Sequence, residues 1–139
     1  MTPDQIALVQ RSFSKVAPIS EQAARLFYGR LFEIAPEVKP LFAKADIREQ
    51  GKKLMGTLAV VVGGLTDLPA ILPAASRLAK LHVGYGVAPA HYAPVGAALL
   101  WTLEQGLGQD WTPDLAEAWT TAYTTLSSYM IAEANSVAA

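Results

Sequence analysis

The sequence contains no cysteine and only two histidines, His82 and His91. The lack of cysteine excludes disulfide bonds, zinc–thiolate sites, iron–sulfur clusters and thiol nucleophiles within these 139 residues. A metal site that needs several histidines is excluded by the same count. Any metal held tightly here must therefore take few ligands from the protein.

Charged residues are also few. They make up 17% of the chain against 52% hydrophobic residues, a balance that excludes a disordered protein. The 11 Lys and Arg residues and 12 Asp and Glu residues give a net charge of −1, so no nucleic-acid partner is expected. The length predicts one domain over residues 1–139, with a core large enough to enclose a ligand.

Neither a long hydrophobic run nor a targeting segment is visible. The nearly uncharged, apolar stretch of residues 54–66 is too short to span a bilayer. The N-terminus lacks the basic start and apolar run of a signal peptide. The sequence therefore predicts a soluble, cytoplasmic protein with no membrane partner.

Apolar residues recur at helical spacing along the whole chain, and no window alternates as a β-strand would. Prolines and glycines separate the periodic segments, with Pro69 and Pro73 expected to break the chain. The expected helices lie at about 2–17, 20–35, 46–65, 74–83, 89–106 and from 112 onward. The sequence thus predicts an all-α fold of six or seven helices.

His82 is the first candidate functional residue. It lies near the end of a predicted helix, beside Leu81 and one turn after Leu78, so its neighbours are apolar. One interpretation, which spacing alone favours, is a helix-terminal histidine stabilised by the helix dipole. The other is a metal ligand, and haem iron suits a lone histidine because the porphyrin supplies four ligands. His91, after Pro89, is interpreted as a partly exposed capping residue.

Tyr28 and Gln50 form a second candidate group with Lys53 and Leu54. Tyr28 lies on the apolar stripe of its predicted helix, and a buried phenol needs a polar partner. Gln50 and Leu54 share a helix face because they are four residues apart. If the two helices cross, these side chains would line a cavity for a small polar ligand. If they do not, Tyr28 caps a core edge and Gln50 is merely exposed.

Four segments follow one another in a characteristic order. They are residues 27–32 (FYGRLF) with 35–42 (APEVKPLF), residues 68–73 (LPAILP) followed by His82, residues 91–96 (HYAPVG), and Ala118 and Trp119 with Tyr123. Together they resemble single-domain bacterial globins and flavohaemoglobins, and they are similar to neuroglobin. The resemblance covers essentially the whole chain. It implies a globin fold of six to eight helices around haem b.

The resemblance also implies roles for single residues. His82 stands where globins place the proximal iron ligand, while Tyr28 and Gln50 match the distal pair that hydrogen-bonds bound dioxygen in flavohaemoglobin-like globins. Because neuroglobin has histidine in place of Gln50, a bis-histidine resting state is not expected. The remaining matched haem-pocket positions are Phe42, Lys53, Leu54, Leu78, Leu81, Val87, Tyr92, Val95, Tyr123 and Leu126.

One position departs from the flavohaemoglobin pattern. In that family a Tyr and a Glu polarise the proximal histidine. Tyr92 fills the first place, but Ala134 stands in the second. Glu133 is one residue away, which turns it by about 100° around a helix. Strong electron donation from the proximal histidine to the iron is therefore not expected, and neither is the peroxidase-like chemistry that it favours.

The expected function is reversible binding or carriage of dioxygen, with nitric oxide and carbon monoxide as further ligands. The alternative is a nitric oxide dioxygenase. Since no flavin or nicotinamide domain follows Ala139, that enzyme would depend on a separate reductase. A gas sensor would normally need a fused output domain, and a haem-free helical binding module remains only if the resemblance is accidental.

Overall fold

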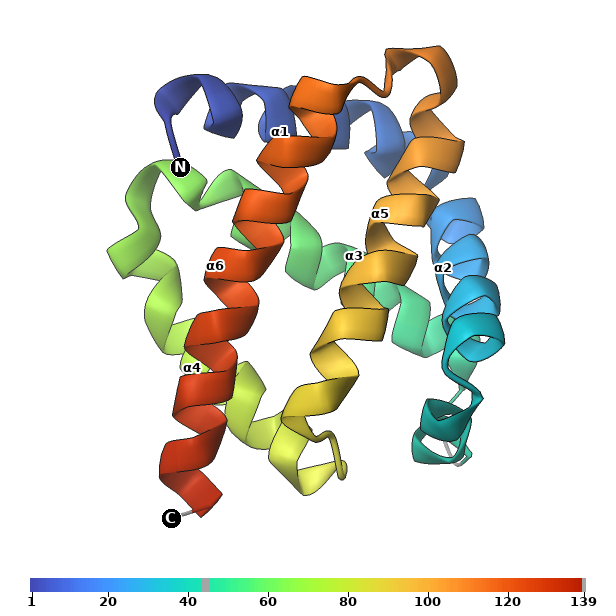
Figure 1. Ribbon diagram of the computed structural model, residues 1–139, viewed down its shortest axis with the longest axis vertical. Coiled ribbons are helices and arrows are strands. Elements are labelled where there is room, and N and C mark those ends of the chain that lie inside the picture. Colours follow the sequence, from blue (N-terminus) through green and yellow to red (C-terminus); the bar gives the residue numbers. More distant parts are fainter. Residues whose placement is uncertain (44–45, 139) are drawn as a thin grey trace.

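A computed structural model describes residues 1–43 and 46–138 of the protein (Figure 1). These residues form six α-helices joined by short 3₁₀ helices, with no strand among them. The helices are α1 (Pro3–Val16), α2 (Ser20–Ile34), α3 (Ile47–Gly63), α4 (Leu68–Gly84), α5 (Tyr92–Leu107) and α6 (Pro113–Ala138). The all-α prediction is confirmed.

Three helices begin where their capping residues predict. The Oγ1 atom of Thr2 accepts a hydrogen bond from the Gln5 N–H, and the Gln5 side chain accepts one from the Thr2 N–H, which forms a capping box at α1. The Asp46 carboxylate accepts a backbone N–H at the start of α3, at 3.0 Å. The Thr112 hydroxyl does the same at the start of α6, at 3.1 Å.

The chain around α2 agrees with the predicted range of 20–35. Ser20 is the first residue of α2, and no side chain caps that helix end. The chain then continues as a 3₁₀ helix, η2 (Pro36–Phe42). This short helix places the ring of Phe42 against that of Tyr28, with centroids 5.5 Å apart.

Helix α4 starts earlier than the predicted Ala74. Pro69 lies in its first turn, where the missing N–H has no helical partner in any case. Pro73 lies inside the helix and removes one backbone hydrogen bond. Ile71 and Ala75, on either side of Pro73, are both buried in the core. Tertiary packing therefore holds together a helix that the prolines were expected to break.

The apolar interior falls into two clusters. The larger one includes Leu31, Leu103 and Trp119 and joins α1, α2, α3, α5 and the first half of α6. The smaller one, centred on Ala79 and Met130, joins α4 to the second half of α6. Helix α4 packs chiefly on α6, and α3 lies behind α5 and α6 in Figure 1. The expected haem-pocket residues are divided between the two clusters.

Two buried polar groups, the indole of Trp119 and the hydroxyl of Ser12, are paired with each other between α6 and α1. The indole Nε1 of Trp119 donates to the Ser12 hydroxyl at 2.9 Å. The Ser12 hydroxyl in turn donates to the backbone oxygen of Val9 at 3.0 Å. These bonds fix α6 on α1, as expected where buried polar atoms must be paired.

No single helix among the described residues is long and apolar enough to cross a membrane. Helix α3 and the following segment Leu65–Gly84, bent by 50° at their junction, meet the length and composition requirement only as a pair.

Candidate functional site

The imidazole of His82 is oriented by its own helix. His82 lies half-buried in the last turn of α4, and its Nδ1 is 2.7 Å from the carbonyl oxygen of Leu78. A carbonyl oxygen only accepts, so in the neutral ring Nδ1 carries the proton and Nε2 does not. Metal-ligating histidines commonly hold their second nitrogen in this way. His82 is therefore prepared to offer Nε2 as a ligand.

The end of α4 and the start of α5 enclose this imidazole. The Val87 N–H donates to the backbone oxygen of His82 at 3.0 Å. That turn requires Gly86, whose φ of 87° is one that residues with a side chain rarely adopt. The ring of Tyr85 lies 6.2 Å from the His82 ring on one side, and the ring of Tyr92 is stacked at 6.5 Å.

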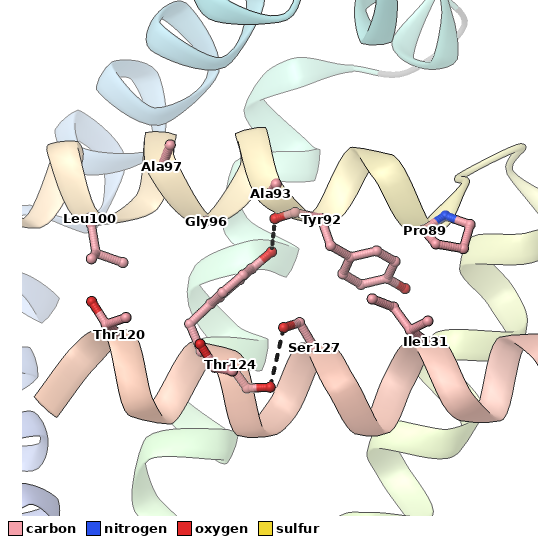
Figure 2. A pocket seen from close by; sticks show the side chains of 11 residues that line it. Pro89, Tyr92, Ala93, Gly96, Ala97, Leu100, Thr120, Thr124, Ser127 and Ile131 are labelled. Atoms are coloured by element: carbon pink, nitrogen blue, oxygen red, sulfur yellow. Dashed lines mark hydrogen bonds between the residues drawn. The ribbon is translucent and has the colours of Figure 1, made fainter. Parts of the chain in front are cut away.

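The hydroxyl of Tyr92 is buried and has no hydrogen-bond partner among the described residues. Its ring lies between α5 and α6, beside Ile131 (Figure 2). Its backbone oxygen accepts a hydrogen bond from the Tyr123 hydroxyl at 2.6 Å. Burial raises the pKa of both phenols, so both stay protonated at neutral pH. An unpaired buried hydroxyl lowers the stability of the folded protein by about 1–3 kcal/mol. A polar partner for the Tyr92 hydroxyl would therefore stabilise the fold.

Glu133 is directed to α4 rather than to Tyr92. Its carboxylate accepts hydrogen bonds from Ser76 and from the Tyr129 hydroxyl, the latter at 3.1 Å. These bonds, together with the nearby charge of Lys80, lower the pKa of Glu133. The neighbouring Ala134 is buried and offers no carboxylate. Tyr92 is thus left without the acidic partner that the flavohaemoglobin pattern would provide.

Helices α2 and α3 cross in close contact at Gly51. A Cβ atom at Gly51 would lie 2.8 Å from Cβ of Ala24 and 4.0 Å from Cε2 of Tyr28. Gln50 is the adjacent residue on α3 and is half-buried. The helices that carry Tyr28 and Gln50 therefore do cross, which is the condition for a shared cavity. That the two side chains line such a cavity stays a prediction.

Three phenylalanine rings hold the Tyr28 ring. Those of Phe27, Phe42 and Phe32 have centroids 5.0, 5.5 and 6.0 Å from it. Tyr28 is only 4% exposed, and burial raises the pKa of its phenol to about 12. Neither its hydroxyl nor the Gln50 side-chain amide has a hydrogen-bond partner in the described part of the chain. Both groups therefore have hydrogen-bonding capacity that the described residues do not use.

An apolar cleft of about 260 Å³ opens between α3 and α4. It separates the helix that bears Gln50 from the helix that bears His82. Three of the expected pocket residues line it, namely Leu78, Leu81 and Leu126. Leu81 is 49% exposed, an unusual amount for a large apolar side chain in a folded interior. The other lining residues are Thr57, Val60, Val61, Ile71, Ala74, Ala75 and Arg77.

The remaining expected residues do not line this cleft. Phe42, Leu54, Val95 and Tyr123 pack against the larger cluster, whereas Lys53 is exposed on α3. The expected residues thus come from five helices and η2 and are divided between the two apolar clusters.

His91 has the capping role that was predicted for it. Its Nδ1 accepts a hydrogen bond from the Ala88 N–H at 2.9 Å in the 3₁₀ helix η4 (Pro89–His91). This bond holds the chain at the entry to α5.

A second groove, of about 410 Å³, lies between α5 and α6 (Figure 2). Small residues of α5 form one wall, and hydroxyl-bearing residues of α6 form the other. At Gly96 a Cβ atom would come within 2.6 Å of the Tyr123 ring, so glycine permits this close packing. Of the expected site residues only Tyr92 and Tyr123 line the groove.

The family model described as Globin matches residues 25–130. The protein belongs to the globin family. This globin is 34% identical over 128 residues to a flavohemoprotein of Rhodopirellula baltica, which covers 91% of the chain and 31% of that protein. It is 32% identical over 133 residues to a flavohemoprotein of Bordetella parapertussis, which covers 94% and 33%. The chain thus spans about a third of the length of these curated relatives.

Solved structures confirm the globin fold. A bacterial globin from Campylobacter jejuni superposes with a TM-score of 0.87 at 25% identity, over 99% of both chains. An engineered carbene transferase, made from a nitric oxide dioxygenase candidate of Rhodothermus marinus, superposes with a TM-score of 0.89 at 26% identity, over 99% of this globin and 96% of that chain.

The residues of this globin fit a haem group. His82 offers one unprotonated nitrogen, which is all that a porphyrin-bound iron needs on its proximal side. Its helix neighbours Leu78 and Leu81 line an apolar cleft, as the macrocycle requires, and Arg77 adds a positive charge to the same lining. Family membership and the flavohemoprotein relatives imply haem binding.

Sequence reasoning missed Gly51 and the cleft residues Thr57, Val61 and Ile71. The signal for Gly51 is present, since a glycine inside a helical pattern often marks a close backbone approach. The cleft residues carry no such signal, because apolar side chains at helical spacing are indistinguishable from core.

Proposed function

We propose that this globin binds haem b and, through it, dioxygen reversibly. The observation that carries the proposal is the 2.7 Å contact between Nδ1 of His82 and the Leu78 carbonyl oxygen, which leaves Nε2 as the iron ligand. Leu78, Leu81 and Leu126 would hold the porphyrin in the cleft. The further proposed contacts are Phe42, Lys53, Leu54, Val87, Tyr92, Val95 and Tyr123.

Held by His82, haem would supply the iron chemistry that binds dioxygen and leaves the bound gas with partial negative charge. The Tyr28 hydroxyl then serves as the hydrogen-bond donor to that partial negative charge. Because its pKa is about 12, the phenol keeps its proton at neutral pH. The aromatic rings around Tyr28 exclude water, and a low local dielectric strengthens the hydrogen bond. The Gln50 amide is the second donor.

Absorption spectroscopy of the haem-loaded protein tests this proposal. We expect one haem per chain, a five-coordinate ferrous form, and a dioxygen form that returns to the ferrous form when oxygen is removed. A chain that takes up no haem would contradict the proposal. So would a ferrous form with two histidine ligands.

A nitric oxide dioxygenase is the second candidate function. The flavohemoprotein relatives and the Rhodothermus marinus structure favour it. Formation of nitrate from nitric oxide and dioxygen consumes one electron, so repeated turnover needs an electron donor. With dioxygen bound, the chain alone should consume nitric oxide once, and an added reductase should sustain consumption. If nitric oxide is consumed without nitrate formation, this candidate is wrong.

A further inference from the structure

The contact between Gly51 and Ala24 sets the separation of α2 and α3. Both residues are buried, and a Cβ atom at Gly51 would lie 2.8 Å from Cβ of Ala24. The opposing methyl group is attached directly to the α2 backbone and cannot rotate away. Any side chain at Gly51 must therefore push the two helices apart.

The two candidate donors flank this contact. Gln50 directly precedes Gly51 on α3, and Tyr28 lies one turn after Ala24 on α2. The Tyr28 ring packs against the rings of Phe27 and Phe42, with centroids 5.0 and 5.5 Å away, and neither ring belongs to α3. If α3 moves outward, Gln50 therefore moves away from Tyr28 instead of carrying it along.

We propose that Gly51 is a positioning residue that determines how strongly the pocket prefers polar over apolar diatomic gases. This inference rests on the proposed binding of gases between Tyr28 and Gln50. A hydrogen bond loses strength steeply with distance and angle. Dioxygen, which is polarised when captured, depends on both donors at once, whereas carbon monoxide depends on them little. The separation of α2 and α3 therefore affects the ratio of the affinities for dioxygen and carbon monoxide.

Three variants test the inference. Gly51→Ala introduces the clash. The exchange Ala24→Gly with Gly51→Ala moves the methyl group from α2 to α3 and restores the spacing. Gly56→Ala is the control, because Gly56 lies on the same helix, is exposed, and has nothing within 4 Å of its Cβ position. For each haem-loaded variant, the affinities for dioxygen and carbon monoxide are measured.

We expect Gly51→Ala to lower the ratio of dioxygen to carbon monoxide affinity by about three- to tenfold, the range that one net hydrogen-bond contribution covers. The exchange variant should recover the wild-type ratio, and Gly56→Ala should keep it. An unchanged ratio in Gly51→Ala, or an unrecovered ratio in the exchange variant, overturns the inference. If Gly51→Ala does not fold, the affinity ratio of the exchange variant alone tests the inference.

A measurement without haem separates this inference from the proposed function. Burial raises the pKa of the Tyr28 phenol to about 12, and this shift does not depend on haem. Gly51→Ala should admit water and lower this pKa toward 10.0, as followed by NMR of labelled tyrosine and assigned with Tyr28→Phe. An unchanged Tyr28 titration overturns the positioning role. Failure of the wild-type protein to bind gas overturns the proposed function instead.

Discussion

The rings of His82 and Tyr92 are stacked, with centroids 6.5 Å apart and planes at 26°. Tyr92 reaches His82 from α5, while the Leu78 carbonyl reaches it from the preceding turn of α4. The imidazole is thus oriented from two helices at once. A ligand whose orientation is fixed in advance loses less freedom when it binds its metal, which favours tight binding.

The first prediction concerns retention of haem. His82→Ala should give protein that loses haem on desalting, because no other nitrogen is held in the same place, and added imidazole should restore binding. His91→Ala is the matched control and should keep haem, since His91 only caps η4. Absorption spectra after gel filtration report the result. An unchanged five-coordinate ferrous spectrum in His82→Ala would show that the assignment is wrong.

The second prediction compares two buried tyrosines. Tyr92→Phe removes a hydroxyl that has no partner among the described residues, so it should raise the free energy of unfolding of the apoprotein by about 1 kcal/mol. Tyr123→Phe removes the 2.6 Å hydrogen bond to the Tyr92 carbonyl and should lower it by about 1 kcal/mol. Urea unfolding measures both. Equal destabilisation by the two variants would mean that an internal water satisfies Tyr92.

The third prediction concerns the Tyr28 hydroxyl. Tyr28→Phe keeps the ring packing but removes the donor. A hydrogen bond to a charged group contributes about 1.5–3 kcal/mol, so dioxygen dissociation should be faster by roughly ten- to a hundredfold. Carbon monoxide dissociation, measured by the same flow method, should change much less. An equal change for both gases would contradict a role as donor.

The fourth prediction concerns the cooperation of the two donors. Gln50→Leu should also speed dioxygen dissociation. If Tyr28 and Gln50 share one ligand, the double variant should fall short of the product of the two single effects. If only Gln50→Leu has an effect, Gln50 alone is the donor.

The fifth prediction concerns acid stability. The pKa of Glu133 is lowered by its hydrogen bonds to Ser76 and Tyr129, so the stabilisation is present above the ordinary value of 4.5 and is lost as pH falls through the folded-state pKa. Glu133→Gln should therefore lower the thermal midpoint at pH 7 and have little effect near pH 3. Glu117→Gln, at an exposed site on the same helix, is the control. A difference that persists at pH 3 would contradict the linkage.

The helices and their starts could be predicted from the sequence because they depend on neighbours within one turn. The capping box of Thr2 and Gln5 and the cap at Asp46 are contacts of this kind. The prediction failed at Pro73, where buried neighbours outweigh the lost hydrogen bond.

The sequence by itself determined the helical segments of this protein and its family resemblance. The resemblance predicted His82 as the iron ligand and Tyr28 and Gln50 as the distal pair. Only the tertiary structure decided that α2 and α3 cross at Gly51 and that the ring of Tyr92 on α5 stacks on the ring of His82. It also decided that the Tyr92 hydroxyl has no partner among the described residues. Periodicity and capping arise from short-range contacts that the order of residues specifies directly. Close approach and unmet hydrogen bonds depend on distant segments, which are brought together by the burial of apolar surface.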